Sequence, residues 1–444
     1  MACRRVLIVT YFFPPAASVG AVRPMGLARF LPKFGWEPVI LTPRDPARGP
    51  YPFDVIETGD RPLFGSLKRG LGGAPDAALK DLLAASPAAA SPFRRAMAAG
   101  IDLAKALLAI PDQQRGWLAP AERAAGRAIR AWHDAGRARV DAVLATGPPF
   151  TAHVLARRLA ATLGVPWVAD FRDLWADNHN STAPAWRCRL DRRIERRTLR
   201  DARALVTVSS PLAQQLATAY PHHRVATILN GFDPDDLAPL DRLNPPRALA
   251  PRFTITHTGT FYQGRRDPSM FLATLAGLFA DGRMDRRRVE VRFFSRHEDW
   301  VLAPVRDLGL EDVVRILPWA PRVEAIAAQR DSHLLLLLHW GGDAERGVYT
   351  GKIFEYLAAR RPVLVVGGGP GVLADLVAET GAGVQVSDRA ALTEQLVRRW
   401  REFESTGTVA YAGREKKIAA YSHERMAREF AWVLDSVAEA RRTG

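Results

Sequence analysis

The sequence predicts an α/β protein with two Rossmann-like lobes, each a doubly wound parallel sheet covered by helices. Three observations support this prediction. Short, continuous apolar runs recur along the chain, as in parallel strands that are buried on both faces. Turns rich in small residues follow several of these runs and lead into amphipathic segments, which is the strand–turn–helix order of such folds. One proline-rich stretch with little periodicity, residues 239–252, divides the runs into two sets.

The composition is that of a globular protein. The chain has 444 residues, of which 48% are hydrophobic and 25% charged, and this length suits two or three domains. Its first apolar run ends at Pro14, which favours a strand over a signal peptide. No apolar run approaches the roughly 20 residues that span a bilayer. The two cysteines, Cys3 and Cys188, exclude a disulfide framework.

The formal net charge of +15 is compatible with nucleic acid, anionic lipid or phosphorylated small molecules as partners. Arginines are spread along the chain and include the helical surface at 186–203. No run interleaves arginine with aromatic residues as an RNA-stacking platform does. We therefore expect no nucleic-acid partner and leave a peripheral contact with an anionic membrane open. A genome rich in G and C would also explain the arginines.

Residues 5–15 form the first predicted strand, and a helix through 27–35 leads to a second strand at 36–43. In the turn between them, Gly20 lets the backbone approach a phosphate or sugar while Arg23 supplies charge. A closely packed turn is the alternative. The turn lacks the G-x-G-x-x-G pattern, and no acidic residue ends the second strand, so dinucleotide binding is disfavoured.

Residues 44–120 interrupt the alternation of strands and helices and are rich in Pro, Gly and Ala. The stretch 93–111 can be drawn as an amphipathic helix with basic residues at its start. A lid, an acceptor-binding element or a membrane contact fits this pattern, and so does a packed surface helix.

A strand–helix–strand unit covers residues 140–171. Its helix carries His153, and its second strand ends near Asp170, Arg172 and Asp173. Side chains at the carboxyl end of a parallel strand face the ligand crevice, so these residues are candidates. A salt bridge that shapes the loop is the alternative for the Asp and Arg residues, and a structural role is the alternative for His153.

The first lobe closes with a strand and helix over 202–217 and a strand and turn over 224–237. Asp233 and Asp235 formally match the D-x-D pattern of some metal–diphosphate sites. So short a pattern occurs often by chance, and these residues fit a turn before a helix better. We predict no metal site.

The second lobe repeats the pattern with six predicted strands, at 253–259, 289–295, 313–321, 333–340, 363–369 and 382–388. The first of them ends at Gly259, and the loop after it carries Arg265 and Arg266. As in the first lobe, a glycine and positively charged residues are therefore expected at the carboxyl end of a parallel strand, where ligands bind. The last segment, 422–442, is predicted to be an amphipathic helix.

The stretch 348–369 reads as a turn, a short helix and a buried strand. Lys352 and Glu355 share one face near the predicted helix start at Thr350 and Gly351. Free N–H groups and partial positive charge at a helix start suit a phosphate, and a carboxylate one turn later can accept hydrogen bonds from two sugar hydroxyls. A nucleoside diphosphate fits both features. An ordinary helix–strand unit with a surface Lys and Glu is the alternative.

Taken together, these segments resemble the GT-B glycosyltransferases and, more narrowly, the retaining family 4 group. The resemblance rests on YFFPPAASVGAVR, WVADFRDLW, VSSPLAQQL followed by LNGFD, HTGTFYQGRRDP and YTGKIFEYLAARRPVL. It covers almost the whole chain outside 44–110. In bacterial relatives WVADFRDLW and KIFEYLA are distinctive, and such proteins often build cell-surface polysaccharides.

The resemblance implies roles for residues at the matching positions. The residues assigned to catalysis neutralise the diphosphate leaving group or orient the acceptor hydroxyl, and they are Arg265, Arg266, Lys352 and Asp173. The donor-binding residues are Gly20, Gly259, Tyr349, Thr350, Gly351 and Glu355, the last of which would bind the ribose. The acceptor-side residues are Arg23, Arg172 and His153. The co-substrate would be a nucleotide-diphosphate sugar, with no cofactor and no metal.

The chain departs from the family pattern at one position. The first glutamate of the family's E-x7-E motif would fall at Gly347, and Glu345 lies two residues too early. The sequence therefore does not identify the residue that contacts the transferred sugar.

The resemblance implies a retaining glycosyltransferase that acts on a lipid-linked or polysaccharide acceptor in bacterial cell-surface glycan synthesis. We expect a cytoplasmic location and leave open a peripheral position on the inner face of the plasma membrane. The predicted domains are an acceptor-binding domain at 1–238 with the 44–120 insertion, a linker at 239–252, a nucleotide-sugar-binding domain at 253–415, and a C-terminal helix at 416–444 that crosses back to the first lobe. A UDP-sugar epimerase of the same fold and a non-catalytic sugar-nucleotide-binding or scaffold protein are the alternatives.

Overall fold

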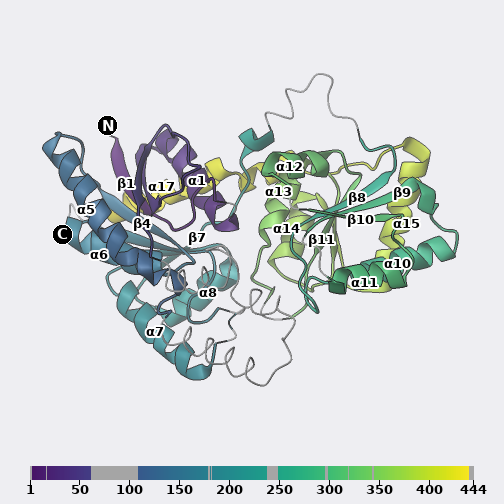
Figure 1. Ribbon diagram of the computed structural model, residues 1–444, viewed down its shortest axis with the longest axis horizontal. Coiled ribbons are helices and arrows are strands. Elements are labelled where there is room, and N and C mark those ends of the chain that lie inside the picture. The colour runs from purple at the N-terminus through teal and green to yellow at the C-terminus, as the bar shows by residue number, and fades with distance from the viewer. Residues whose placement is uncertain are drawn as a thin grey trace. The chain divides into compact units, whose positions relative to one another are not determined.

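The chain folds into two compact units. The computed structural model describes residues 3–16, 18–61, 109–178, 181, 183–237, 249–295, 299–318, 320–342 and 345–439. Unit 1 comprises Met1–Ile228 and Met426–Gly444, and unit 2 comprises Leu229–Arg425. Each unit contains a parallel sheet with flanking helices (Figure 1), as predicted. Most of the predicted insertion, including residues 93–108 of the helix expected at 93–111, lies outside the described residues.

Unit 1 is built on a seven-stranded sheet in the order β3-β2-β1-β4-β5-β6-β7, and every neighbouring pair is parallel. The strands are β1 (Arg4–Val9), β2 (Trp36–Pro43), β3 (Asp54–Thr58), β4 (Ala142–Gly147), β5 (Trp167–Phe171), β6 (Ala204–Thr207) and β7 (Arg224–Thr227). The winding reverses between β1 and β4, so the sheet is doubly wound.

Helices cover both faces of this sheet. They are α1 (Val22–Phe30), α5 (Leu118–Asp134), α6 (Thr151–Leu163), α7 (Ala185–Leu199), α8 (Ser210–Ala219) and α17 (His423–Glu439), with 3-10 turns at Val19–Ala21, Leu31–Phe34 and Gln113–Trp117. Successive strand side chains point to opposite faces. Leu7 therefore joins the buried cluster that includes residues of α5 and α6, whereas Ile8 joins the one that includes residues of α1 and α17.

Helix α17 returns to the first lobe, which confirms that prediction. Trp36 Nε1 donates a hydrogen bond to Asp435 Oδ1 at 2.7 Å, and Arg4 forms an ion pair with the same carboxylate at 2.6 Å. Phe430 and Leu434 of the helix are fully buried in the core of unit 1. The C-terminal segment is therefore part of the first lobe's structure.

Unit 2 contains a six-stranded parallel sheet in the order β10-β9-β8-β11-β12-β13. The strands are β8 (Phe253–Thr258), β9 (Val289–Phe294), β10 (Val314–Leu317), β11 (Leu334–Leu338), β12 (Val363–Val366) and β13 (Gly383–Val386). The helices are α10 (Ser269–Ala280), α11 (Asp299–Asp307), α12 (Arg322–Arg330), α13 (Gly351–Ala359), α14 (Val372–Thr380), α15 (Arg389–Thr406) and α16 (Glu415–Ile418), with 3-10 turns at Pro234–Leu237, Arg286–Arg288 and Ala419–Tyr421. In the described part of the chain, no helix has the length and apolar character needed to cross a membrane.

The contacts place residues 229–237 with unit 2, whereas the predicted N-terminal domain extends to 238. Phe232 N donates to Tyr421 O at 3.0 Å, and His423 N donates to Phe232 O at 2.8 Å. The two segments that connect the units thus pair with each other inside unit 2. Residues 239–248 of the predicted linker lie outside the described residues, so that linker stays a prediction.

Candidate functional site

The loops after β8 and β11 leave the sheet of unit 2 in opposite directions. From β8 the chain proceeds toward β9, and from β11 it proceeds toward β12. The crevice outside the carboxyl ends of two such strands is the usual ligand site of an open parallel sheet. The residues beyond β8, β11 and β12 therefore form the candidate donor site.

Helix α13 carries two predicted residues at this crevice. Lys352 Nζ lies 3.0 Å from Glu355 Oε2, so the two residues share a helical face as their spacing predicts. Arg322 Nη1 lies 3.1 Å from Glu355 Oε1. Gln329 Nε2 donates to Thr258 Oγ1 at 2.9 Å and lies 3.5 Å from Glu355 Oε2. Arg322 and Gln329 were not predicted as site residues, because both belong to α12, and local patterns do not show that α12 packs beside α13.

The start of α13 offers backbone donors. Its N-cap residue, Thr350, makes no side-chain capping hydrogen bond, and Gly351 follows it as the first helical residue. N–H groups at such a helix end carry partial positive charge. Tyr349 is half-buried and packs on Phe354 with the ring centroids 5.8 Å apart. The predicted contacts of Tyr349, Thr350 and Gly351 with a diphosphate stay a prediction.

Tyr356 fixes α13 to the sheet. Its hydroxyl accepts a hydrogen bond from Thr258 N at 3.0 Å and donates one to Leu336 O at 3.2 Å. The side chain is fully buried, and burial raises the pKa of Tyr356 to about 12. Strands β8 and β11 and helix α13 are thereby held together.

Gly259 brings the loop after β8 close to Lys352. A Cβ at Gly259 would lie 3.2 Å from His257 Nε2 and 3.9 Å from Lys352 Cε. His257 Nδ1 donates to Leu336 O at 2.9 Å. Burial lowers the pKa of His257 to about 4, and the charges of Lys352 and Arg266 contribute to the shift. The neutral His257 ring, which the sequence analysis did not single out, is thus near two of the predicted cations, Lys352 and Arg266.

The two predicted arginines of this loop contact aromatic rings. The Arg265 guanidinium lies 3.8 Å from the centroid of the Trp340 ring, and that of Arg266 lies 5.6 Å from the centroid of Tyr262. A guanidinium over a ring face is held in a defined orientation. Since Trp340 follows β11, the contact of Arg265 joins the loops on the two sides of the crevice.

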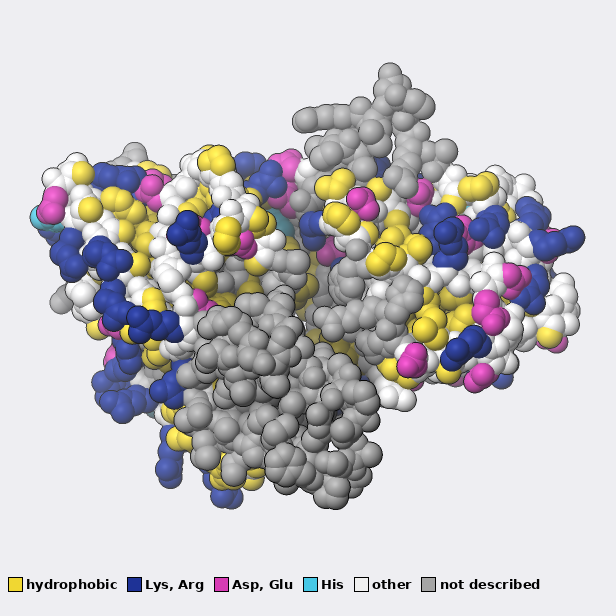
Figure 2. All heavy atoms as spheres, in the orientation of Figure 1, with side chains coloured by type: hydrophobic (Ala, Val, Ile, Leu, Met, Phe, Trp, Pro, Cys, Tyr) yellow, Lys and Arg dark blue, Asp and Glu magenta, His cyan; other side chains and the backbone are white. Residues whose placement is uncertain are grey.

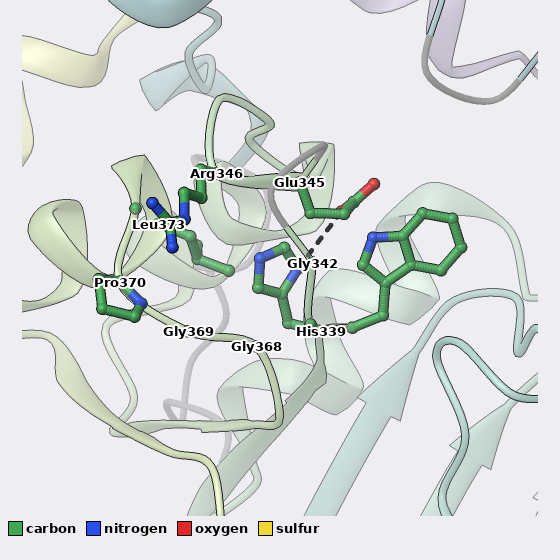
Figure 3. Close-up of a pocket in the computed structure, with 11 residues that line it drawn as sticks. His339, Gly342, Glu345, Arg346, Gly368, Gly369, Pro370 and Leu373 are labelled. Carbon is green, nitrogen blue, oxygen red and sulfur yellow. Dashed lines mark ion pairs between the residues drawn. The ribbon is translucent and has the colours of Figure 1, made fainter.

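A pocket of about 290 Å³ lies beyond the carboxyl ends of β11 and β12 (Figure 3). His339 Nδ1 and Glu345 Oε2 are 3.6 Å apart, and their side chains are 6% and 5% exposed. Figure 3 shows the two side chains directed at each other, with Arg346 directed toward the segment that carries Pro370. A Cβ at Gly368 would lie 2.4 Å from His339 Cδ2. Gly368 belongs to the turn Gly367–Gly369 after β12, which we call the glycine turn, and a glycine is required at this position for the imidazole to fit.

The sequence analysis noted Glu345 without assigning a role to it. It missed His339, Trp340 and Arg346. A glycine triplet directly after a buried parallel strand is the signal that would have directed attention to this pocket.

In unit 1, Arg23 forms a buried ion pair with Asp170. Its Nε and Nη2 donate to the two oxygens of Asp170 at 2.9 Å each, and Nη2 also donates to Ile228 O at 2.9 Å. The side chains of Arg23 and Asp170 are 2% and 0% exposed. This geometry favours the salt-bridge alternative for Asp170 and a structural role over an acceptor contact for Arg23.

Arg172 joins the turns that follow three strands of unit 1. It donates to Gly20 O at 3.0 Å, to Thr146 Oγ1 at 3.1 Å and to Pro148 O. Burial lowers the pKa of Arg172 to about 10. A Cβ at Gly20 would lie 3.1 Å from Arg172 Nη2. The tight fit favours the closely packed turn for Gly20 and a loop-shaping role for Arg172.

His153 and Asp173 lie near the same edge of the sheet. His153 is fully buried, with Nε2 3.1 Å from Asp170 O, and burial lowers its pKa to about 4. This favours the structural alternative for His153. Asp173 is half-buried in the loop after β5. Its charge raises the pKa of Arg172, against the larger lowering by burial. Asp173 is therefore partly accessible beside this edge of the sheet.

Glu195 of α7 supports the segment that follows Asp173. Its carboxylate accepts a hydrogen bond from Ala176 N at 3.1 Å, and burial raises the pKa of Glu195 to about 7. The folded state thus binds this proton more tightly than the unfolded chain, whose value is near 4.5. Raising the pH from 5 to 8 therefore lowers stability through this group, by up to about 3 kcal/mol.

We expect Glu195→Gln to remove that pH dependence. The stability of the variant relative to the native chain should rise between pH 5 and pH 8, measured by urea unfolding at both values. Glu394→Gln, an exposed change on α15, is the matched control and should shift stability by less than about 0.5 kcal/mol. An equal difference between the Glu195 variant and the native chain at both pH values would contradict the prediction.

Within the described ranges, no group of three or more His, Cys, Asp or Glu side chains is arranged to hold a metal ion. Asp235 N donates to Asp233 Oδ1 at 2.9 Å, so these residues form the turn that the sequence favours.

Residues 20–231 match the sequence model of the glycosyl transferase 4-like domain. The chain is a glycosyltransferase of GT-B fold. The match spans most of unit 1 and includes the segments YFFPPAASVGAVR, in part, and WVADFRDLW. A glycosyltransferase of this kind takes its sugar from a nucleotide sugar. No curated protein sequence gives a significant match.

Solved structures similar to this glycosyltransferase are distant in sequence. Sucrose-phosphate synthase from Thermosynechococcus elongatus has a TM-score of 0.55 at 13% identity, with 99% of this chain and 98% of that chain covered. A glycosyltransferase from Rickettsia africae has a TM-score of 0.58 at 14% identity, with 98% of each covered. HepE from Anabaena, solved with UDP-glucose, has a TM-score of 0.55 at 15% identity, with 98% and 99% covered. These similarities establish the two-sheet fold.

Proposed function

We propose that unit 2 binds a nucleoside diphosphate sugar at the start of α13. The observation that supports this most directly is the charge arrangement around Glu355. Lys352 and Arg322 flank its carboxylate at 3.0 and 3.1 Å, beside an uncapped helix start. The diphosphate would bind the N–H groups and Lys352, and the ribose hydroxyls would bind Glu355. The UDP-glucose complex of HepE makes a UDP-sugar the first donor to test.

The proposed chemistry is sugar transfer with retention of configuration. Departure of the nucleoside diphosphate places negative charge on its leaving oxygen, and fixed positive groups stabilise that charge most in the transition state. Lys352, Arg265 and Arg266 supply such groups from α13 and the loop after β8. With these cations, we propose that the reaction needs no metal. The acceptor hydroxyl would attack from the face that the leaving group vacates.

For the transferred sugar we propose Glu345, oriented by His339. The family position for this role is Gly347, which has no side chain. Glu345 is two residues away, and its carboxylate is directed by the buried His339 at 3.6 Å. A buried carboxylate that accepts hydrogen bonds from sugar hydroxyls distinguishes one sugar from another, because a missing hydroxyl leaves it unpaired.

The acceptor is proposed to be lipid-linked or a polysaccharide, with unit 1 as its binding domain and Asp173 as the residue that orients the hydroxyl. The proposed setting is bacterial cell-surface glycan synthesis in the cytoplasm, at the inner face of the plasma membrane. The net charge of +15 supports electrostatic binding of the protein to anionic lipid.

The first experiment is a nucleotide-release assay over UDP-, GDP- and ADP-sugars, with EDTA present, with and without bacterial membrane lipid extract. We expect release from one donor, raised by the extract. Binding of a donor without release in any condition would contradict transfer, and an absence of both would overturn the donor site. Release only when a divalent metal replaces EDTA would contradict metal independence.

Glu355→Gln tests the donor site itself. We expect this change to weaken donor affinity by about 10- to 100-fold, because hydrogen bonds to a charged group are worth about 1.5–3 kcal/mol. Calorimetric titration of the preferred donor measures the effect, and Glu394→Gln on α15 serves as the control. Donor affinity equal to that of the native chain would show that Glu355 does not bind the ribose.

A further inference from the structure

One face of α7 is a stripe of arginine side chains with a tryptophan at its start. At 100° per residue, five positions fall within an arc of about 100°. They are Trp186, Arg189, Arg193, Arg196 and Arg197, and all five are exposed. We call this set the arginine stripe. Figure 2 shows dark blue Lys and Arg side chains along the lower left margin of unit 1, the region where Figure 1 places α7.

The acidic residues of α7 lie away from the arginine stripe. Asp191 Oδ2 accepts a hydrogen bond from Arg187 Nε at 2.8 Å, and Glu195 is 4% exposed. Both fall outside the arc that holds the stripe. In the described ranges, none of the four arginines of the stripe forms an ion pair.

The spacing within the stripe places like charges one helical turn apart. Arg189 precedes Arg193 by four residues, and Arg193 precedes Arg197 by four. Like charges at this spacing destabilise a helix when nothing offsets them. An extended anionic surface beside the helix would compensate the repulsion among all of these arginines.

We propose that the arginine stripe docks unit 1 on an anionic lipid bilayer. The stripe runs along a single 15-residue helix, so its charges lie in a row that meets a flat surface. Arginines near an anionic leaflet gain electrostatic attraction, and tryptophan prefers the membrane–water interface. The exposed Trp186 lies at one end of the row and is not interleaved with the arginines, unlike the aromatic residues of single-stranded nucleic-acid sites. This inference rests on the proposed membrane-side acceptor and assigns the docking surface.

The test compares two triple variants of the full-length chain. The first is Arg189→Gln, Arg193→Gln and Arg197→Gln in the stripe. The second is Arg123→Gln, Arg127→Gln and Arg130→Gln, three exposed arginines of α5, with the same loss of charge. Each is sedimented with vesicles of phosphatidylcholine alone and with added phosphatidylglycerol, over a salt series. We expect the native chain to bind only the anionic vesicles, and the stripe variant to bind them about 100-fold more weakly, since each arginine contributes roughly a factor of five.

The α5 variant should keep most of the vesicle binding. Equal losses of vesicle affinity in the two variants would show that binding depends only on total charge and would overturn the proposal. Native binding that is equally strong with and without the anionic lipid would also overturn it. Loss of RNA oligonucleotide binding with vesicle binding intact would also overturn it. Donor affinity without vesicles should be the same in the stripe variant and the native chain. A native chain that docks on vesicles but binds no donor would overturn the proposed function while supporting the docking surface.

Discussion

Replacing Lys352 by methionine is expected to slow nucleotide release from the donor by about 100- to 1000-fold. Removing one preorganised group that faces developing negative charge costs about 2.7–4 kcal/mol in comparable sites. Methionine keeps most of the aliphatic stem of lysine, and Arg322 still pairs with Glu355 at 3.1 Å, so the fold should persist. Steady-state kinetics measures the effect, which should fall mainly on kcat because the charge develops in the transition state.

Lys416→Met is the matched control for this change. Lys416 is exposed on α16, and its substitution should leave release unchanged. A Lys352→Met enzyme with native kcat would exclude Lys352 from the leaving-group site. A rise in KM with unchanged kcat in this variant would mean that Lys352 stabilises the bound donor and the transition state equally.

Replacing Arg23 by methionine is expected to cost about 3–5 kcal/mol of stability. Asp170 is 0% exposed, and the two hydrogen bonds from Arg23 at 2.9 Å compensate its buried charge. Breaking a buried pair by removing one partner leaves an uncompensated charge in the core. Urea unfolding followed by circular dichroism should show the loss in the transition of unit 1.

The double change Arg23→Met and Asp170→Asn separates charge burial from packing. It should be less destabilised than Arg23→Met alone, because no charge remains unpaired. Arg123→Met, an exposed change on α5, should shift stability by less than about 0.5 kcal/mol. If Arg23→Met kept the native stability but no longer transferred sugar to the acceptor, Arg23 would instead be an acceptor-binding residue.

The sheets were predictable because their signals are local. An apolar run such as LLLLL at 334–338 identifies a strand buried on both faces, whatever lies elsewhere in the chain. The spacing of Lys352 and Glu355 likewise places both on one turn of a helix. The amphipathic last segment predicted a packed helix, and α17 fulfils that prediction in the first lobe.

The partners of the site residues were less predictable. Arg322 is 33 residues from Glu355, and Arg23 is 147 residues from Asp170. Periodicity does not reveal such pairs, because loop geometry decides which elements become neighbours. For the same reason the sequence treated Arg23, Arg172 and His153 as acceptor-side candidates, whereas burial and hydrogen bonding in unit 1 favour their structural alternatives.

The sequence by itself thus determined two parallel sheets, the loops at the carboxyl ends of their strands, and the helix that carries Lys352 and Glu355 on one face. Each of these depends on hydrophobic spacing, turn residues or helix geometry within a few residues. Only the tertiary structure decided that His339 lies beside Glu345 at the glycine turn, and that the four arginines of the arginine stripe are exposed while Glu195 of the same helix is buried. Those outcomes depend on burial and on contacts between distant segments, which exist only once the chain has packed.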